Sequence, residues 1–355
     1  MTTAVQDIRF CTSSDGTRIA YAVHGSGPPL VLDACWLSHL QYDWQSPVWR
    51  HYLVEFGKFA TVIRFDERGH GLSDRDVVDF SPQARLADLE AVVDDAGVDR
   101  FALLAMAQGG PISIEYTARH PERVTRLILY GSYANAVVNM SEEDRELDEA
   151  FESLIKVGWE HPTPEFRRVF TYQMIPGATE EQMRWLDELQ REAVSADTAV
   201  VSRQQRKLAD AGALLAQLHL PTLVIHAKGD RMNRFDEARH LAANIEGARL
   251  VALESDNHIV LEDEPAWPVM RNEVEKFVVA DQAPEAVDEA LGSLSSREVE
   301  VLSLAAAGDD NETIAQRLTL SVRTVERHLQ NVYLKLGVTG KNARTAAVAR
   351  FLARA

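Results

Sequence analysis

Side chains that can contact nucleic acid recur at helical spacing near the carboxyl end of the chain. Arg323, Arg327 and Asn331 follow one another at intervals of four residues, so on a helix they stack one turn apart. A guanidinium can donate two hydrogen bonds to a guanine edge, or bind a phosphate. A helix with such a face can enter the major groove of DNA with its amino end first. The alternative is that the cationic face is merely solvated, and residue types alone do not decide between the two.

The residues around this face predict the helices that position it. Ser295 and Glu298 have the spacing of a capping box at a helix start. Asp310 caps a second helix, and Ser321 caps a third helix that runs to Leu336. Only a short turn separates the second and third helices, which is the geometry of a helix-turn-helix. One stripe of the third helix is predicted to be buried, and it consists of Val322, Val325, Leu329, Val332 and Leu336.

The segment SSREVEVLSLAAAGDDNETIAQRLTLSVRTVERHLQNVYLKLGV resembles the LuxR-type DNA-binding domain almost throughout. The resemblance implies that Thr324, Arg327 and His328 face DNA and that Asn331, Lys335 and Lys341 act near its backbone. A last helix over 343–352 would pair two protomers. We therefore expect a homodimer that binds double-stranded DNA at an inverted-repeat operator, with RNA polymerase as a further partner. The predicted DNA-binding residues are Arg323, Thr324, Arg327, His328, Asn331, Lys335 and Lys341.

Glu326 departs from the family pattern, because family members often have lysine at this position. Its carboxylate could accept a hydrogen bond from a cytosine amine. It could equally pair with Arg323 or Arg327 and weaken the affinity for DNA.

Composition narrows the class of protein. The chain has 355 residues, of which 46% are hydrophobic and 26% charged, a balance typical of globular domains. No stretch approaches the ~20 continuous apolar residues of a membrane span. The amino terminus lacks the basic and apolar parts of a secretory signal, and two cysteines exclude a disulfide-built protein. We therefore expect a cytoplasmic protein without membrane association, cofactor or metal.

Charge is distributed unevenly along the chain. From residue 291 onward there are nine Lys and Arg against six Asp and Glu, a net charge of +3. Since the whole chain carries −17, residues 1–290 carry −20. A basic tail on an acidic body is expected if only the tail meets phosphate.

Proline and tryptophan mark the domain boundary. All 13 prolines lie at or before Pro284, and all six tryptophans at or before Trp267. Residues 280–290 are polar and acidic, as in a linker. The prediction is a body over 1–279 and a DNA-binding domain over 291–355.

The body alternates short apolar runs with amphipathic stretches, which predicts an α/β fold with a mostly parallel sheet. The predicted strands are Ile8–Cys11, Arg18–Val23, Leu30–Asp33, Thr61–Phe65, Phe101–Ala105, Arg126–Tyr130, Thr222–Ala227 and Arg249–Leu253. From about residue 134 to 220 the pattern is helical and free of strands. An insertion at the carboxyl edge of a sheet is where a lid would lie.

Two parts of the body resemble the α/β-hydrolases. After the strand that ends at Ala105 comes Met-Ala-Gln-Gly-Gly, at the place of the family's G-x-S-x-G nucleophile elbow, and Ala107 stands where the serine belongs. Asp230 and His258 follow later strands in the family's order of acid and base. The resemblance further implies an oxyanion hole formed by the backbone N–H groups of Trp36 and Gln108. A methyl group cannot attack a carbonyl, so no residue is predicted to be catalytic and Ala107, Asp230 and His258 form a degenerate triad.

A hydrolase pocket without its serine remains a concave site under a lid. Its predicted lining is Trp36, Ser38, His39, Met106, Ala107, Gln108, Tyr133, Trp159 and His258. Such a site can bind a small carbonyl- or carboxylate-bearing molecule without turning it over. Joined to a DNA-binding tail, it predicts a ligand-responsive transcriptional regulator that is not an enzyme.

Two other interpretations stay open. The chain could be an active α/β-hydrolase fused to a DNA-binding domain, either through water activated by Asp230 and His258 or because Ala107 is an engineered replacement of the nucleophilic serine. Alternatively, the body could be purely architectural and serve only to dimerise and position the tails.

Overall fold

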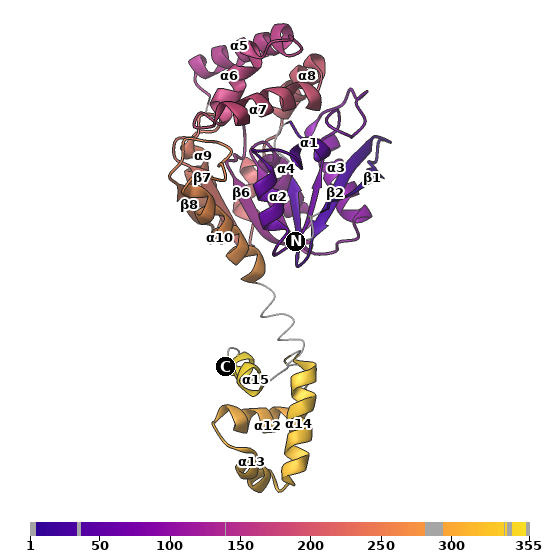
Figure 1. Cartoon of the computed structure of the whole chain (residues 1–355), viewed down its shortest axis with the longest axis vertical. Coiled ribbons are helices and arrows are strands. Elements are labelled where there is room, and N and C mark those ends of the chain that lie inside the picture. The colour runs from indigo at the N-terminus through magenta and orange to yellow at the C-terminus, as the bar shows by residue number, and fades with distance from the viewer. Residues whose placement is uncertain are drawn as a thin grey trace. The chain divides into compact units, whose positions relative to one another are not determined.

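The computed structural model describes residues 5–33, 37–138, 140–280, 294–336, 338 and 343–352. The chain divides into two compact units, residues 1–279 and residues 280–355 (Figure 1). Apart from Ala280, the predicted linker lies outside the described residues.

The first unit is built on an eight-stranded sheet with the order β1-β2-β4-β3-β5-β6-β7-β8. Strand β2 pairs antiparallel with β1 and β4, and all other pairs are parallel. The strands are β1 (Asp7–Thr12), β2 (Arg18–Gly25), β3 (Pro29–Asp33), β4 (Thr61–Phe65), β5 (Phe101–Met106), β6 (Val124–Tyr130), β7 (Thr222–Ala227) and β8 (Arg249–Leu253). All eight predicted strands are confirmed, each within two residues of its predicted ends.

Successive residues of the central strands face opposite layers. In β5, Leu103 and Ala105 enter one apolar cluster, and Ala102 and Leu104 enter the other. Helices α3 (Pro82–Asp95), α4 (Gly109–Arg119) and α9 (Phe235–Asn244) contribute to the first cluster, and α2 (Arg50–Phe56) and α10 (Ala266–Val279) to the second. Because both faces of the sheet are covered at its centre, the central strand β5 is apolar and buried along its whole length. The α/β fold with a mostly parallel sheet, predicted from the sequence, is confirmed.

Between β6 and β7 the chain forms a helical cap. It consists of α5 (Glu142–Gly158), α6 (Glu165–Met174), α7 (Glu180–Ala193), α8 (Ala196–Arg206) and the 3-10 helix η1 (Gly212–Gln217). Figure 1 shows α5 to α8 gathered over one end of the sheet. Capping boxes begin α5 at Ser141 and α7 at Thr179. Trp159 and Phe170 are buried and join the cap to the body's apolar cluster. We call α5 to α8 the lid.

The second unit contains α12 (Ser296–Ala306), α13 (Asn311–Leu318), α14 (Val322–Lys335) and α15 (Ala343–Leu352). The predicted capping box is confirmed, since the Ser295 hydroxyl accepts from the backbone N–H of Glu298 and the Glu298 carboxylate accepts from Ser295. Asp310 and Ser321 cap the next two helices, as predicted. The predicted burial of Val322 is wrong, because this residue is 39% exposed. Val322 begins α14, and the buried stripe starts one turn later, at Val325.

None of the helices in the described residues is long and apolar enough to cross a lipid bilayer.

Candidate ligand pocket and DNA-binding surface

A sharp turn joins β5 to α4, and Ala107 lies at its centre. Ala107 has a φ of 46°, a left-handed conformation that costs an L-residue free energy. Its neighbours must be small, because a Cβ on Gly109 would meet the backbone oxygen of Asp33 at 2.8 Å and one on Gly110 would overlap Ser132. The turn therefore has the strained backbone and small neighbours predicted for a nucleophile elbow, with an alanine side chain at its centre.

Asp230 and His258 meet beside this turn. The Nδ1 atom of His258 lies 2.6 Å from Oδ2 of Asp230, and both side chains are buried. Oδ1 of Asp230 accepts hydrogen bonds from the backbone N–H groups of Met232 and Asn233, at 2.8 and 3.0 Å. Burial alone would raise the pKa of the Asp230 carboxyl, but the charge of His258 and the hydrogen bond from His226 lower it below its usual range. The carboxylate thus stays ionised and orients the imidazole.

Glycine at position 131 is required by the position of this imidazole. A Cβ there would lie 2.9 Å from Cε1 of His258, and the backbone already has a φ of 55°. Glycine at position 131 therefore leaves room for the imidazole of His258 in the orientation in which it contacts Asp230.

A cavity of about 290 Å³ opens between the elbow and the lid. It brings together four residues predicted to line it, which are Ala107, Gln108, Tyr133 and His258. The remaining lining comes from the segment after β6, from α5, α6 and α8, and from the segment after β7 into α9. We call this space the elbow cavity.

The predicted lining needs correction at four positions, since Ser38, His39, Met106 and Trp159 are not among the residues around the elbow cavity. The Ser38 hydroxyl accepts from the backbone of Glu67, and His39 caps the short helix α1 (Leu40–Asp43). Met106 packs in the apolar cluster, as does Trp159, whose indole donates to the backbone oxygen of Val194 at 3.0 Å. Trp36 lies outside the described residues, so its share in an oxyanion hole stays a prediction.

A buried polar network underlies the elbow cavity. Nε2 of Gln108 and a guanidinium nitrogen of Arg85 donate to the same Glu67 oxygen, at 2.8 and 2.6 Å. Arg206, at the end of α8, donates to the amide oxygen of Gln108. Burial alone would raise the pKa of the Glu67 carboxyl, but Arg85 and Arg206 lower it below its usual value. Gln108, the residue after Ala107, is therefore hydrogen-bonded both to Glu67 of the body and to Arg206 of the lid.

Sequence reasoning missed the lid cations of the elbow cavity, Arg203, Arg206 and Lys207. Their spacing of three and four residues puts them on one face of a helix, which was the available signal.

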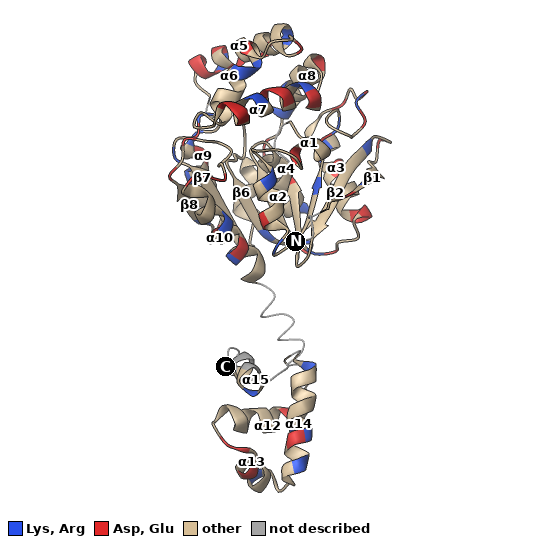
Figure 2. Cartoon of the chain, viewed as in Figure 1, with Lys and Arg blue, Asp and Glu red and all other residues tan. Residues whose placement is uncertain are grey.

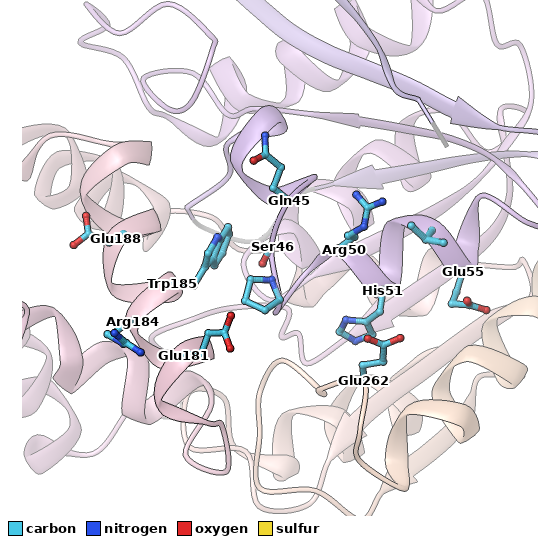
Figure 3. Close-up of a pocket in the computed structure, with 12 residues that line it drawn as sticks. Gln45, Ser46, Arg50, His51, Glu55, Glu181, Arg184, Trp185, Glu188 and Glu262 are labelled. Atoms are coloured by element: carbon cyan, nitrogen blue, oxygen red, sulfur yellow. The ribbon is translucent and has the colours of Figure 1, made fainter. Parts of the chain in front are cut away.

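A second and larger cavity, of about 730 Å³, lies between α7 and the region of α2. Figure 3 shows Trp185 and Arg184 on the lid side, and Arg50 and His51 on the opposite side. Neither Ala107 nor His258 lines it, and it contains no part of the elbow. Of these two cavities, the smaller elbow cavity is therefore the one that contains the elbow and the oriented imidazole. In the described residues, no group of three His, Cys, Asp or Glu could hold a metal ion.

The predicted DNA-binding face of α14 is accessible. Arg323, Arg327 and Asn331 are exposed, whereas Thr324 and His328 are half-buried. Figure 2 shows basic and acidic positions side by side along this helix. Glu326 makes no ion pair with any described residue, so pairing with the neighbouring arginines gains no support.

Lys335 has a partner within the second unit. Its ammonium lies 2.7 Å from Oε2 of Glu298, a buried carboxylate of the capping box on α12. This ion pair ties the end of α14 to the start of α12 and gives Lys335 a structural role. Its contact with DNA stays a prediction, and Lys341 lies outside the described residues.

Comparison with known proteins agrees with both units. Residues 38–265 match the family model of the alpha/beta hydrolase fold, and residues 292–348 match the model of bacterial regulatory proteins of the luxR family. An AB hydrolase superfamily protein, YisY, of Bacillus subtilis is 27% identical over 66% of this chain and 86% of its own length.

Two further similarities concern the body. A putative carbamate hydrolase, RutD, of Azorhizobium caulinodans is 27% identical over 67% of this chain and 87% of its own length. A solved hydrolase structure from Pseudomonas aeruginosa has a TM-score of 0.64 at 22% identity, and the match covers 76% of this chain and 98% of that one. The similarity in structure shows the fold alone.

Proposed function

The chain belongs to the alpha/beta hydrolase fold family and carries a luxR-family DNA-binding domain, and from this premise we propose that it is a ligand-responsive transcriptional regulator. In this proposal the body binds a small carbonyl- or carboxylate-bearing molecule and does not turn it over. The second unit binds double-stranded DNA and thereby regulates transcription.

One observation carries the proposal: Ala107 occupies an intact nucleophile elbow beside an intact pair of Asp230 and His258. Without a hydroxyl at position 107 there is no atom to form an acyl-enzyme. The elbow cavity, the lid and the oriented imidazole all remain, and these are the parts that bind a ligand. A sensor must bind its ligand without converting it. A cavity that keeps its binding groups but has no nucleophile at position 107 fits this requirement.

The DNA-binding half of the proposal is supported by the luxR-family match and by the exposed face of α14. We propose that two copies of the chain pair through α15 and bind an inverted-repeat operator, because a two-fold dimer presents two recognition helices to two half-sites. We further propose that the DNA-bound dimer contacts RNA polymerase. Ligand binding alters transcription if the ligand binds two arrangements of the chain with different affinity.

The second candidate function is an active hydrolase fused to a DNA-binding domain. The observation that favours it is the same 2.6 Å contact between His258 and Asp230, since a pair so well oriented can also activate water. An engineered replacement of serine by Ala107 would preserve the same geometry.

A thermal-shift screen tests sensing against a purely architectural body. We expect at least one class among short esters, lactones and carboxylates to raise the Tm of the full-length chain, by roughly 2–4 °C per factor of ten in ligand excess. The same compounds should be recovered chemically intact after the incubation.

Two outcomes contradict the proposal. A screen in which no compound shifts the Tm favours the architectural body. Turnover by the present chain, if His258→Ala abolishes it, establishes the hydrolase instead.

A further inference from the structure

One acidic side chain lies among the exposed cations of α14. Glu326 is exposed, and so are Arg323, three residues before it, and Arg327, the residue after it. Residues three apart are neighbours on the surface of a helix and often form ion pairs. Glu326 nevertheless makes no ion pair or hydrogen bond with any residue that the structure describes. Its carboxylate therefore keeps its full capacity to accept hydrogen bonds from a partner.

Other charged side chains of the second unit are engaged within it. Lys335 pairs with Glu298 of α12, and Arg317 of α13 pairs with Asp309. By contrast, the three charged side chains on the first two turns of α14 have no ion pair with any described residue. The charged groups that do not stabilise the unit are thus gathered on the face that is predicted to enter the major groove.

A carboxylate on this face has a cost when DNA binds. Phosphate oxygens carry negative charge, so they repel Glu326. An ionised carboxylate only accepts hydrogen bonds, and phosphate oxygens offer it no donor. Loss of its hydration at the interface is therefore favourable only where a donor on a base takes the place of water.

The edges of the bases decide which donor suits Glu326. The major groove offers two amines, N4 of cytosine and N6 of adenine. Adenine also presents its N7 acceptor beside the amine, and this atom repels a carboxylate, whereas cytosine presents only the donor. Guanine, the partner of cytosine, presents the two acceptors that a guanidinium binds. A carboxylate beside an arginine therefore matches a C·G base pair.

We propose that Glu326 is a specificity-determining residue that accepts a hydrogen bond from the N4 amine of a cytosine in the major groove. The carboxylate weakens binding to sequences that place a phosphate or an acceptor opposite it, and it strengthens binding to the sequence that places cytosine there. Such discrimination uses repulsion as well as attraction. The inference rests on the proposed function and names one base that the operator contains.

The first test compares the sequences that full-length variants select from random double-stranded DNA. The unmodified chain should require cytosine at one position of each half-site. Glu326→Ala should accept all four bases at this position, because the carboxylate is gone. Glu326→Gln should shift the preference to adenine, since a carboxamide can accept from the N6 amine and donate to N7.

Glu312→Gln is the matched control for this selection. Glu312 is an exposed glutamate on α13 that, like Glu326, has no ion pair with any described residue. Loss of either negative charge strengthens binding to any DNA, so only the selected sequence distinguishes the two positions. The control should select the same sequence as the unmodified chain.

The second test uses the unmodified chain and a changed base. The selected cytosine is replaced by 2-pyrimidinone, which lacks only the amine, and the Kd is measured by fluorescence anisotropy. We expect the Kd to rise by about 5-fold or more, the usual effect of one mismatched base pair. The same replacement outside the half-sites should leave the Kd unchanged, and Glu326→Ala should bind both DNAs equally well.

The outcomes separate this inference from the proposed function. If both Glu326 variants select the sequence of the unmodified chain, if the position that changes does not hold cytosine, or if removal of the amine leaves the Kd unchanged, the cytosine assignment is overturned and DNA binding stands. If the unmodified chain selects no sequence, the proposed regulator is contradicted together with the assignment. Should the Glu326 variants fail to fold, the changed base on the unmodified chain decides the question alone.

Discussion

Replacing Ala107 with serine is expected to convert the elbow cavity into an esterase site. Position 107 already has the φ of 46° of the elbow, so the new hydroxyl enters without a backbone change. His258 lines the same cavity and is oriented by Asp230 at 2.6 Å, ready to accept the hydroxyl proton. We expect Ala107→Ser to hydrolyse nitrophenyl acetate on the order of 10³-fold faster than the unmodified chain, which is a small part of the ~10⁶-fold that a complete triad contributes.

The control for this gain of activity is the double variant Ala107→Ser, His258→Ala, which should return to the rate of the unmodified chain. A Tm close to that of the unmodified chain shows that the serine is accommodated. An Ala107→Ser variant that folds but stays inactive would show that the body has lost more of the hydrolase site than its nucleophile.

Loss of Arg327 should have the largest effect on DNA binding. Arg327 is exposed on α14, with Arg323 one turn before it and Asn331 one turn after it. From this position a guanidinium reaches a guanine edge, or a phosphate, in the major groove. Arg327→Ala is expected to weaken specific DNA binding by about 1–3 kcal/mol, which corresponds to roughly 5–150-fold in Kd.

Arg317→Ala provides the matched control for this DNA-binding measurement. Arg317 is an exposed cation of the same unit, on α13, and it pairs with Asp309 at 2.9 Å. Both variants lose one positive charge, so an equal loss of affinity would reveal only general attraction to phosphate. Unchanged binding of Arg327→Ala in a fluorescence titration would refute the contact.

The strands were predictable from sequence because their burial leaves a local signal. In β5 and β7 every residue is buried, so each strand appears in the sequence as a short and largely apolar run. The helices of the second unit were predictable for a similar reason, since Ser295, Asp310 and Ser321 each cap the helix that follows.

The lining of the elbow cavity was only partly predictable, because it depends on contacts between distant segments. Gln108 reaches Glu67 across 41 residues, and Arg206 reaches Gln108 across 98. No periodicity in a single segment reports such contacts. Trp159 shows the opposite error, since its size suggests a pocket wall, whereas its indole is buried against Val194 within the lid.

The same limit applies to Lys335 and Val322 on α14. Helical periodicity places Lys335 on the polar side, yet only the packing of α14 against α12 reveals its partner Glu298. Periodicity also continues the apolar stripe to Val322, but a stripe is buried only where a neighbouring helix covers it. Residue spacing predicts which side chains share one face of a helix, but only the tertiary structure shows what packs against that face.

The measurement that tests the central claim most directly is the affinity of the full-length chain for DNA with and without ligand. A preferred DNA site is first selected from random sequences by the full-length chain. Its Kd is then measured by fluorescence anisotropy, with and without a saturating concentration of the compound that most stabilises the chain in the thermal-shift screen. We expect the Kd to change by about 5-fold or more, the usual scale of coupling between two sites. An identical Kd under both conditions, for a compound that demonstrably occupies the elbow cavity, would contradict the account.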